Sequence, residues 1–337
     1  MSKILVTGSA GFIGYHLVKS LIKRNHDVIG IDNLNEYYDK KLKTKRLDNL
    51  NLLKEDHSYS GSYDFYQLDL IDKNRLEELF SKNKFEIIIN LAAQAGVRYS
   101  IDNPYSYMES NLVGFMNILE CCRSSEIKHL IFASSSSVYG MNMQQPFSVD
   151  HNTNFPISLY ASTKKSNEVL AFSYSHLYDI PMTGLRFFTV YGPFGRPDMA
   201  YFKFTKAINE GKSIDIYNYG KMKRDFTYID DVVHGILGAI NKIPEEQNNN
   251  ISSSKARFKI YNLGNNKPIT LKEFINCIEE ALQKKAILNE LPMQLGDVPI
   301  TYADISDAKK ELGFNPKTDI KEGISNFVKW YKDFYLD

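Results

Sequence analysis

The chain has 337 residues, of which 43% are hydrophobic and 24% are charged, as in globular proteins with one large core or two joined lobes. Its net charge of +1 provides no overall field for nucleic acid or a membrane surface, so neither is an expected partner. The three cysteines, Cys121, Cys122 and Cys277, show neither a disulfide framework nor a metal-ligand spacing, so we expect a reducing compartment and no metal site.

The first half of the chain alternates between short apolar runs and helical patterns. The stretch 1–7 lacks the apolar core and cleavage site of a signal peptide, and no run of about 18 apolar residues occurs, so a cytoplasmic protein is expected. Bounded apolar runs suit buried parallel strands. Strands are predicted at 3–7, 27–31, 64–68, 86–91, 130–134 and 182–187. Helices are predicted at 12–24, 40–53, 73–82, 105–123 and 161–178. This alternation predicts an α/β fold with a Rossmann-type, doubly wound parallel sheet.

The rhythm changes after Gly192, where a loop rich in proline and glycine begins. Further on, helices are predicted at 201–210, 231–240, 271–282 and 320–335, strands at 214–217, 224–228 and 259–263, and an exposed polar loop at 245–255. We therefore expect residues 1–190 to form mainly the Rossmann domain. Residues 191–337 should form mainly a smaller C-terminal α/β lobe that binds substrate at the carboxyl edge of the sheet, with some elements interleaved between the two.

A glycine-rich turn follows the first predicted strand and opens the first helix. Its sequence is Gly8-Ser-Ala-Gly11-Phe12-Ile13-Gly14, and this context is the one that a dinucleotide-binding turn requires. The phosphates would lie on the free N–H groups of the helix. Asp32, 18 residues after Gly14, would accept from ribose hydroxyls and favour NAD over NADP. The 1–190 part is thus the expected NAD-binding domain.

One further acidic residue, Asp69, follows the third predicted strand. It has two readings: a contact to the adenine edge of the cofactor, or the residue that opens the next helix.

The stretch Tyr160-Ala-Ser-Thr-Lys164 places a phenol and an ammonium one helical turn apart. A lysine beside a tyrosine hydroxyl favours the phenolate, so Tyr160 is a candidate proton acceptor near neutral pH. A solvated helix face is the alternative reading. A serine run, 134–137, follows the fifth predicted strand and places hydroxyls where the nicotinamide would lie, so Ser135 is the candidate third catalytic group, although serine runs also occur in ordinary loops.

These features together resemble the extended short-chain dehydrogenase/reductases of the nucleotide-sugar epimerase and dehydratase group. The matching residues also include Leu91-Ala92-Ala93 and the segment 224–231, and they cover nearly the whole chain. The resemblance implies that Ser135 binds the sugar hydroxyl, that Tyr160 takes its proton, and that Lys164 holds the nicotinamide ribose. Dehydratases of this group have Asp-Glu after the catalytic hydroxyl. Here Ser136 and Ser137 stand there, which disfavours dehydration.

Two segments, 92–100 and 189–200, resemble the UDP-glucuronate 4-epimerase subfamily. That resemblance implies that Ser137, Thr189 and Arg196 hold the sugar carboxylate, for which an arginine fork is well suited. Asn90 and Leu295 depart from the pattern of relatives, which often have His and Pro there. The full set of substrate-binding candidates is Arg98, for which no role is assigned, Ser135, Ser136, Ser137, Thr189, Arg196, Arg224, Gln294 and Asp297.

The implied activity is NAD-dependent inversion of carbon 4 of a UDP-sugar through a 4-keto intermediate. The expected reaction converts UDP-glucuronate to UDP-galacturonate for surface polysaccharide synthesis. The alternatives are a UDP-glucose or UDP-N-acetylhexosamine 4-epimerase, a UDP-glucuronate decarboxylase, or a non-catalytic NAD-binding scaffold or redox sensor. The resemblance also implies a homodimer formed through the helices at 105–123 and 161–178.

Overall fold

A computed structural model describes residues 2–56, 58–246, 254–294 and 297–336. Most of the predicted loop at 245–255, and Leu295, lie outside the described residues.

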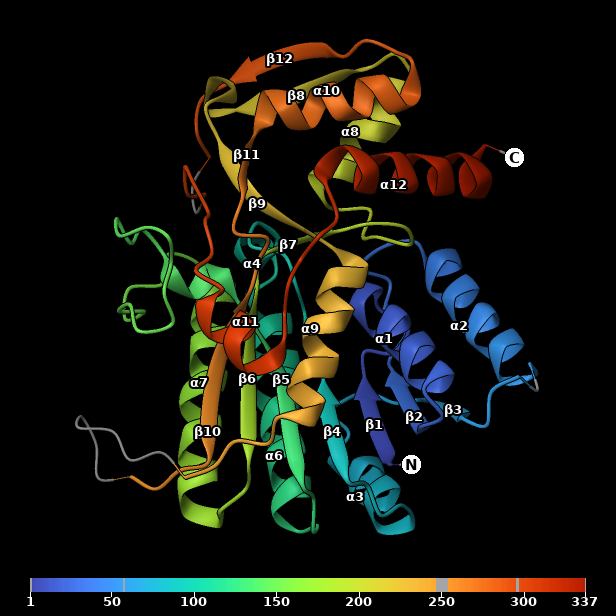
Figure 1. Cartoon of the computed structure of the whole chain (residues 1–337), viewed down its shortest axis with the longest axis vertical. Helices are drawn as coiled ribbons and strands as arrows, with labels where there is room; N and C mark the ends of the chain where they lie inside the picture. Colours follow the sequence, from blue (N-terminus) through green and yellow to red (C-terminus); the bar gives the residue numbers. More distant parts are fainter. Residues whose placement is uncertain (1, 57, 247–253, 295–296, 337) are drawn as a thin grey trace.

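A parallel sheet of seven strands forms the centre of the larger part of the molecule (Figure 1). Its strand order is β10-β6-β5-β4-β1-β2-β3, and every neighbouring pair is parallel. The strands are β1 (Lys3–Thr7), β2 (Asp27–Asp32), β3 (Ser62–Gln67), β4 (Ile87–Asn90), β5 (His129–Ser135), β6 (Met182–Phe187) and β10 (Phe258–Leu263). The predicted doubly wound parallel sheet is confirmed.

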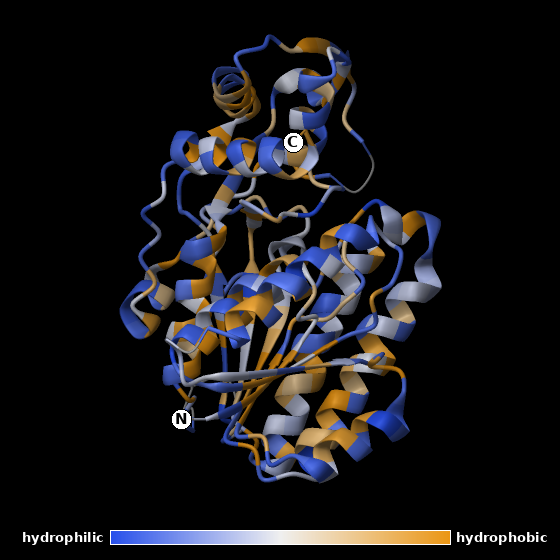
Figure 2. Ribbon diagram, turned by 90° about the vertical axis from the view of Figure 1, so that its right-hand side faces the viewer, coloured by the Kyte–Doolittle hydropathy of each residue, from blue (hydrophilic) through white to orange (hydrophobic). Residues whose placement is uncertain are grey.

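Helices cover both faces of this sheet, which explains why its strands read as nearly continuous apolar runs. In Figure 2 the hydrophobic strands lie between helices whose outer surfaces are hydrophilic. On one face α1 packs against α2 and α9, and α11 packs against α9. On the other, α6 packs against α3 and α7. These helices are α1 (Phe12–Lys23), α2 (Lys40–Lys54), α3 (Lys73–Lys82), α6 (Gly114–Arg123), α7 (Leu159–Tyr178), α9 (Ile229–Asn241) and α11 (Ser306–Leu312).

The smaller lobe lies beyond the carboxyl ends of the strands (Figure 1). It contains a three-stranded sheet, β11-β9-β7, and a two-stranded sheet, β12-β8. Its elements are β7 (Thr189–Tyr191), α8 (Ala200–Asn209), β8 (Ser213–Tyr217), β9 (Lys223–Tyr228), β11 (Pro268–Thr270), α10 (Leu271–Leu282), β12 (Ile287–Leu291) and α12 (Ile320–Tyr335), with a 3₁₀ turn, η3 (Asn218–Gly220). Aromatic contacts fill this lobe, such as the stacked rings of Phe226 and Phe274, whose centroids are 4.4 Å apart.

The chain crosses between the two parts more than once. After the first strands of the smaller lobe, α9 and β10 return to the large sheet, where β10 forms an edge beside β6. Figure 1 shows β10, in orange, next to the green β5 and β6. The strand order reverses between β1 and β4, so the crevice of the sheet opens at this point, facing the smaller lobe.

The predicted helix at 105–123 is wrong in detail, because this stretch is divided. After a short α4 (Tyr99–Asp102) come α5 (Pro104–Tyr107), a π-helical turn η1 (Met108–Val113) and then α6. A π turn frees one backbone carbonyl from the regular ladder, and here the Asn167 amide donates to the Asn111 carbonyl at 2.7 Å. Strands β7, β11 and β12 and helix α11 were also not predicted.

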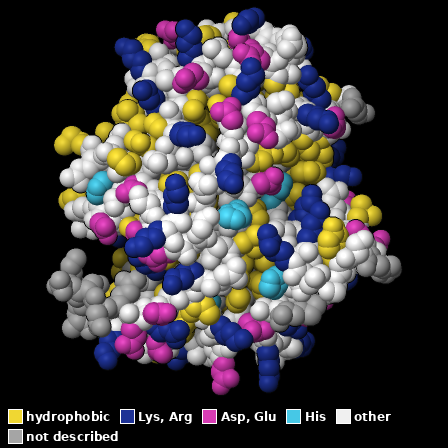
Figure 3. All heavy atoms as spheres, viewed as in Figure 1, with side chains coloured by type: hydrophobic (Ala, Val, Ile, Leu, Met, Phe, Trp, Pro, Cys, Tyr) yellow, Lys and Arg dark blue, Asp and Glu magenta, His cyan; other side chains and the backbone are white. Residues whose placement is uncertain are grey.

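Positive and negative side chains are mixed over the face seen in Figure 3, in line with the net charge of +1. Within the described part of the chain, none of the helices is long and apolar enough to cross a bilayer.

Candidate active site

A cavity of about 930 Å³ lies between the large sheet and the smaller lobe. Its wall contains nearly all of the predicted site residues. These are Gly8, Gly11, Phe12, Ile13, Gly14, Asp32, Asp69, Leu91, Ala92, Ala93, Arg98, Ser135, Ser136, Ser137, Tyr160, Lys164, Thr189, Arg196, Arg224 and Asp297. Gln294 is described but does not line this cavity, so its role stays a prediction.

The glycine turn leaves room for a ligand at the start of α1. Gly8 has φ +71°, and a Cβ there would lie 2.9 Å from the Ala92 backbone nitrogen. A Cβ at Gly14 would lie 2.1 Å from the Gly8 carbonyl oxygen, so the helix approaches the turn closely only because both residues are glycine. No side chain caps α1 at Gly11, which leaves its first N–H groups free for an anion. The turn therefore fits a dinucleotide diphosphate.

Asp32 ends β2 with a buried carboxylate that accepts from the Leu34 N–H at 2.8 Å. Lys43, from α2, lies 3.5 Å from this carboxylate and also lines the cavity, although its place was not predicted. No sequence spacing signals that pair, because it depends on how α2 docks. Asp69 accepts from the Asn33 amide at 2.8 Å, and the N-cap of α3 is Asp72. The reading of Asp69 as the helix opener is therefore wrong.

Three catalytic candidates meet at the end of β5. Ser135 is the last residue of that strand, and Tyr160 and Lys164 lie one turn apart in α7, whose N-cap is Ser158. The Ser135 hydroxyl accepts from the Ser137 N–H at 3.2 Å and lies close enough to the Tyr160 phenol to affect its pKa. Burial raises the pKa of Tyr160, and this hydroxyl and the Arg196 guanidinium oppose the rise.

The Lys164 ammonium is held by the main chain of β5. It is buried and donates to the Ala133 carbonyl at 3.0 Å. Burial lowers the pKa of Lys164 to about 8. The expected lowering of the Tyr160 pKa by Lys164 stays a prediction.

The loop after β4 is held by groups that sequence reasoning missed. Asn111, in the π turn, accepts from the Gln94 N–H at 2.8 Å and donates to the Gln94 carbonyl at 3.0 Å. It also donates to the Thr163 hydroxyl of α7 at 3.0 Å, so it fixes the loop against the helix that carries Tyr160. Asn90, at the end of β4, accepts from the Thr7 hydroxyl at 2.7 Å and so joins the first strand to this loop.

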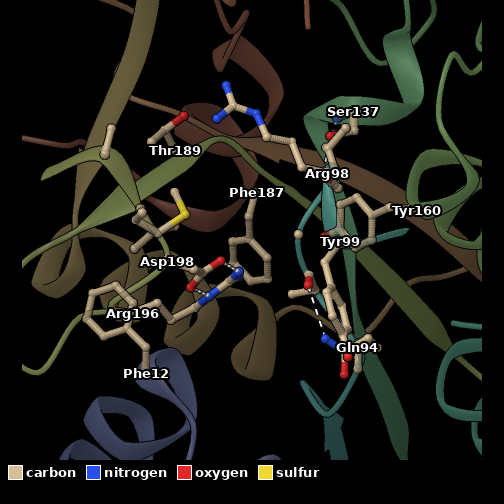
Figure 4. Close-up of a pocket in the computed structure, with 18 of the residues that line it drawn as sticks. Phe12, Gln94, Arg98, Tyr99, Ser137, Tyr160, Phe187, Thr189, Arg196 and Asp198 are labelled. Atoms are coloured by element: carbon tan, nitrogen blue, oxygen red, sulfur yellow. Dashed lines mark hydrogen bonds and ion pairs between the residues drawn. The ribbon is translucent and has the colours of Figure 1, made fainter. Parts of the chain in front are cut away.

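One wall of the cavity contains the three residues that are predicted to hold a carboxylate. Ser137, Thr189 and Arg196 lie on three separate segments that border the same space (Figure 4). Arg196 forms a bidentate ion pair with Asp198, through Nε to Oδ1 at 3.0 Å and Nη2 to Oδ2 at 2.5 Å. Asp198 was not predicted, although an acidic residue two positions after an arginine was a visible signal.

At the far end of the cavity two arginines lie near Asp297. Arg98 pairs with it at 3.1 Å and lies over the Tyr217 ring, 4.7 Å from its centroid. Arg224 donates to the carbonyls of Lys223 and Pro299. Burial lowers the pKa of Arg224, and the Asp297 charge opposes this. Two guanidinium groups in one cavity can attract a diphosphate.

Comparisons with known proteins agree with this geometry. Residues 4–264 match the model of the NAD dependent epimerase/dehydratase family. The chain is 52% identical to Protein CapI of Staphylococcus aureus over 340 residues, 99% of each chain. It is 44% identical to a probable UDP-glucuronate 4-epimerase of Rhizobium meliloti, over 99% of this chain and 98% of the relative. The structure superposes with a TM-score of 0.86 on UDP-glucuronic acid 4-epimerase from Bacillus cereus in complex with UDP-glucuronic acid and NAD. That protein is 33% identical, and the match covers 99% of this chain and 100% of the other.

Proposed function

The chain belongs to the NAD dependent epimerase/dehydratase family, and we propose that it converts UDP-glucuronate to UDP-galacturonate by inverting carbon 4, with NAD as its cofactor. The observation that carries this proposal is the shared cavity of Ser135, Tyr160 and Arg196. The first two suit the oxidation of a sugar hydroxyl, and the third suits a carboxylate. The relatives named above supply the substrate class.

The chain's own residues account for the proton transfers. Ser135 holds the sugar hydroxyl beside the phenol of Tyr160, which takes its proton and later returns it. When bound, NAD supplies the reversible oxidation at carbon 4, and its positive charge favours the phenolate. Lys164 would hold the ribose that carries the nicotinamide ring of NAD. The 4-keto sugar must present its opposite face before reduction, so the sugar turns within the cavity while the nucleotide stays bound.

UDP-glucuronate brings a hazard that other hexoses do not. Oxidation at carbon 4 makes it a β-keto acid, which loses carbon dioxide when the C5–C6 bond aligns with the carbonyl π system. That bond then breaks, its electron pair enters the C4 carbonyl, and C5 takes up a proton. We infer that Ser137, Thr189 and Arg196 hold the carboxylate away from this alignment.

Replacing Arg196 with Ala tests that inference. The ratio of decarboxylated pentose to epimer should rise about 10-fold or more, since a hydrogen bond between charged groups is worth about 1.5–3 kcal/mol. The exposed arginine of α3, Arg75, provides the control Arg75→Ala, which should leave the ratio unchanged. If Arg196→Ala epimerises as fast as wild type and forms no more decarboxylated pentose, this role is excluded.

Three other activities make different predictions. A UDP-glucose or UDP-N-acetylhexosamine 4-epimerase would prefer those sugars to UDP-glucuronate. A decarboxylase would release carbon dioxide in every turnover. A non-catalytic NAD-binding scaffold or redox sensor would not need Tyr160, so an unchanged function in Tyr160→Phe would favour it.

We also propose a homodimer that forms through the outer face of η1, α6 and α7. Large apolar side chains are exposed there: Val113, Val169, Phe172 and Leu177. A mainly apolar groove lies between these helices, and an exposed apolar patch of this kind is typical of a contact surface.

The free cysteines Cys121, Cys122 and Cys277 suit a reducing compartment, so we propose a cytoplasmic location. A role of the product in surface polysaccharide synthesis remains part of the same proposal.

A further inference from the structure

Arg196 presents only part of its guanidinium to the cavity, because Asp198 holds the rest. The carboxylate takes the side edge, formed by Nε and Nη2. This leaves the end edge, formed by Nη1 and the second N–H of Nη2, where the described residues provide no hydrogen-bond partner. Figure 4 shows the pair on one side of the cavity and Tyr160 and Ser137 on the other.

Asp198 is itself held by Tyr37, whose hydroxyl donates to its Oδ2 at 3.1 Å. Tyr37 lies in the loop that follows β2, a few residues beyond Asp32 on the cofactor side. Burial alone would raise the pKa of Asp198, but the Arg196 charge and the hydrogen bonds from Arg196 and Tyr37 outweigh it and hold the pKa below its usual value. Burial raises the pKa of Tyr37 to about 12, so its hydroxyl stays a donor.

The position of Tyr37 is fixed by packing as well as by that hydrogen bond. Its ring lies against Tyr99, with centroids 4.8 Å apart. Its hydroxyl lies over Gly96, where a Cβ would come within 2.6 Å of the oxygen. Gly96 also has φ +105°, a backbone conformation that favours glycine. The loop after β4 thus leaves a space that Tyr37 fills.

The charges argue against a role for Arg196 as a simple positive charge that attracts the substrate. Arg196 and Asp198 together are neutral, so the pair attracts a substrate carboxylate less strongly than a lone arginine would. If Asp198 served only to strengthen substrate binding, it would not form a bidentate ion pair with Arg196. What the pair gains is a fixed guanidinium plane, since a bidentate contact holds both the position and the orientation of the group.

We propose that Asp198 and Tyr37 are positioning residues: they turn the end edge of Arg196 toward the sugar carboxylate and thereby favour epimerisation over decarboxylation. This rests on the proposed function above. Through Tyr37, the loop after β2 would then affect which product forms, in addition to its place beside the cofactor. The substrate carboxylate joins Arg196 without displacing Asp198, because the two carboxylates use different edges of one guanidinium.

Product analysis with UDP-glucuronate tests the proposal in wild type, Asp198→Asn, Tyr37→Phe and Arg196→Ala. In Asp198→Asn the pentose-to-epimer ratio should rise about 10-fold, the effect expected for a lost hydrogen bond between charged groups. The KM for UDP-glucuronate should stay the same or fall, because the positive charge is kept and a negative charge is removed. Tyr37→Phe keeps the ring contacts and should raise the ratio less, about threefold, because Tyr37 acts on Arg196 through Asp198.

A merely structural role would change stability or KM without changing the ratio. Tyr66→Phe, which removes an exposed hydroxyl from β3, is the matched control and should behave as wild type. A wild-type ratio in both Asp198→Asn and Tyr37→Phe, beside a raised ratio in Arg196→Ala, would overturn this proposal and leave the proposed function standing. Tyr37→Phe alone decides the matter if Asp198→Asn does not fold. A wild-type enzyme without activity on UDP-glucuronate would overturn both.

Discussion

Burying Lys164 for function should cost the protein stability, and this cost can be measured. Lys164 is 3% exposed, and among the described residues its ammonium has one hydrogen bond, to the Ala133 carbonyl. Burial lowers its pKa from 10.5 to about 8. Such a shift corresponds to about 3 kcal/mol of unfavourable free energy when both the folded and the unfolded states carry the proton, that is, below about pH 8.

The variant Lys164→Met removes this cost while it keeps a long side chain. It leaves the Ala133 carbonyl without its partner, which costs about 1 kcal/mol. At pH 7 the nucleotide-free variant should therefore be more stable than wild type by about 2 kcal/mol, although it lacks activity.

The sign of the pH dependence follows from the lowered pKa. Between pH 8 and 10.5 the unfolded chain binds the proton more readily than the folded one, so wild-type stability gains with rising pH. The advantage of Lys164→Met should shrink by about 2 kcal/mol between pH 7 and 9.5. Urea unfolding at several pH values gives this difference, with the exposed Lys73→Met as the control. A variant that is less stable than wild type at pH 7, or a difference independent of pH, would refute the reasoning.

Three further predictions concern chemistry, cofactor and assembly. Tyr160→Phe should lower kcat by about 10²- to 10⁴-fold through loss of the proton acceptor, while cofactor binding measured by fluorescence persists; full activity would contradict this. Gly8→Ala should lower the free energy of unfolding by about 1–3 kcal/mol and weaken NAD binding, because a side chain at φ +71° meets Ala92; calorimetry and NAD titration check both, and wild-type values would exclude a close approach. Val169→Lys should convert the proposed dimer to monomer in light scattering, since a charge replaces an exposed apolar contact; an unchanged mass would rule out this face.

The sequence predicted the parts of the fold that local pattern controls. The apolar runs of β1 and β4, and the glycine turn at Gly8, depend on short-range requirements of strands and turns, and the structure has them where expected. The break of the helix at 105–123 could not be read in this way. A π turn has no propensity signal of its own, and it is stabilised here because the Asn167 amide donates to the Asn111 carbonyl.

The candidate site was predictable where residues lie near one another in the chain. Tyr160 and Lys164 are one turn apart, and the spacing indicated a shared helix face. The hydrogen bond of the Lys164 ammonium was not predictable, because its acceptor, the Ala133 carbonyl, lies 31 residues earlier in the chain. Tyr37 and Asp198 meet over a separation of 161 residues, which only the docking of the two lobes determines.

Incubation of the purified protein with UDP-glucuronate, with and without added NAD, tests the central claim most directly. Identification of the product by NMR should show UDP-galacturonate, with little pentose and with faster turnover than for UDP-glucose. Failure to turn over UDP-glucuronate, formation of decarboxylated pentose alone, or a clear preference for UDP-glucose would contradict the account.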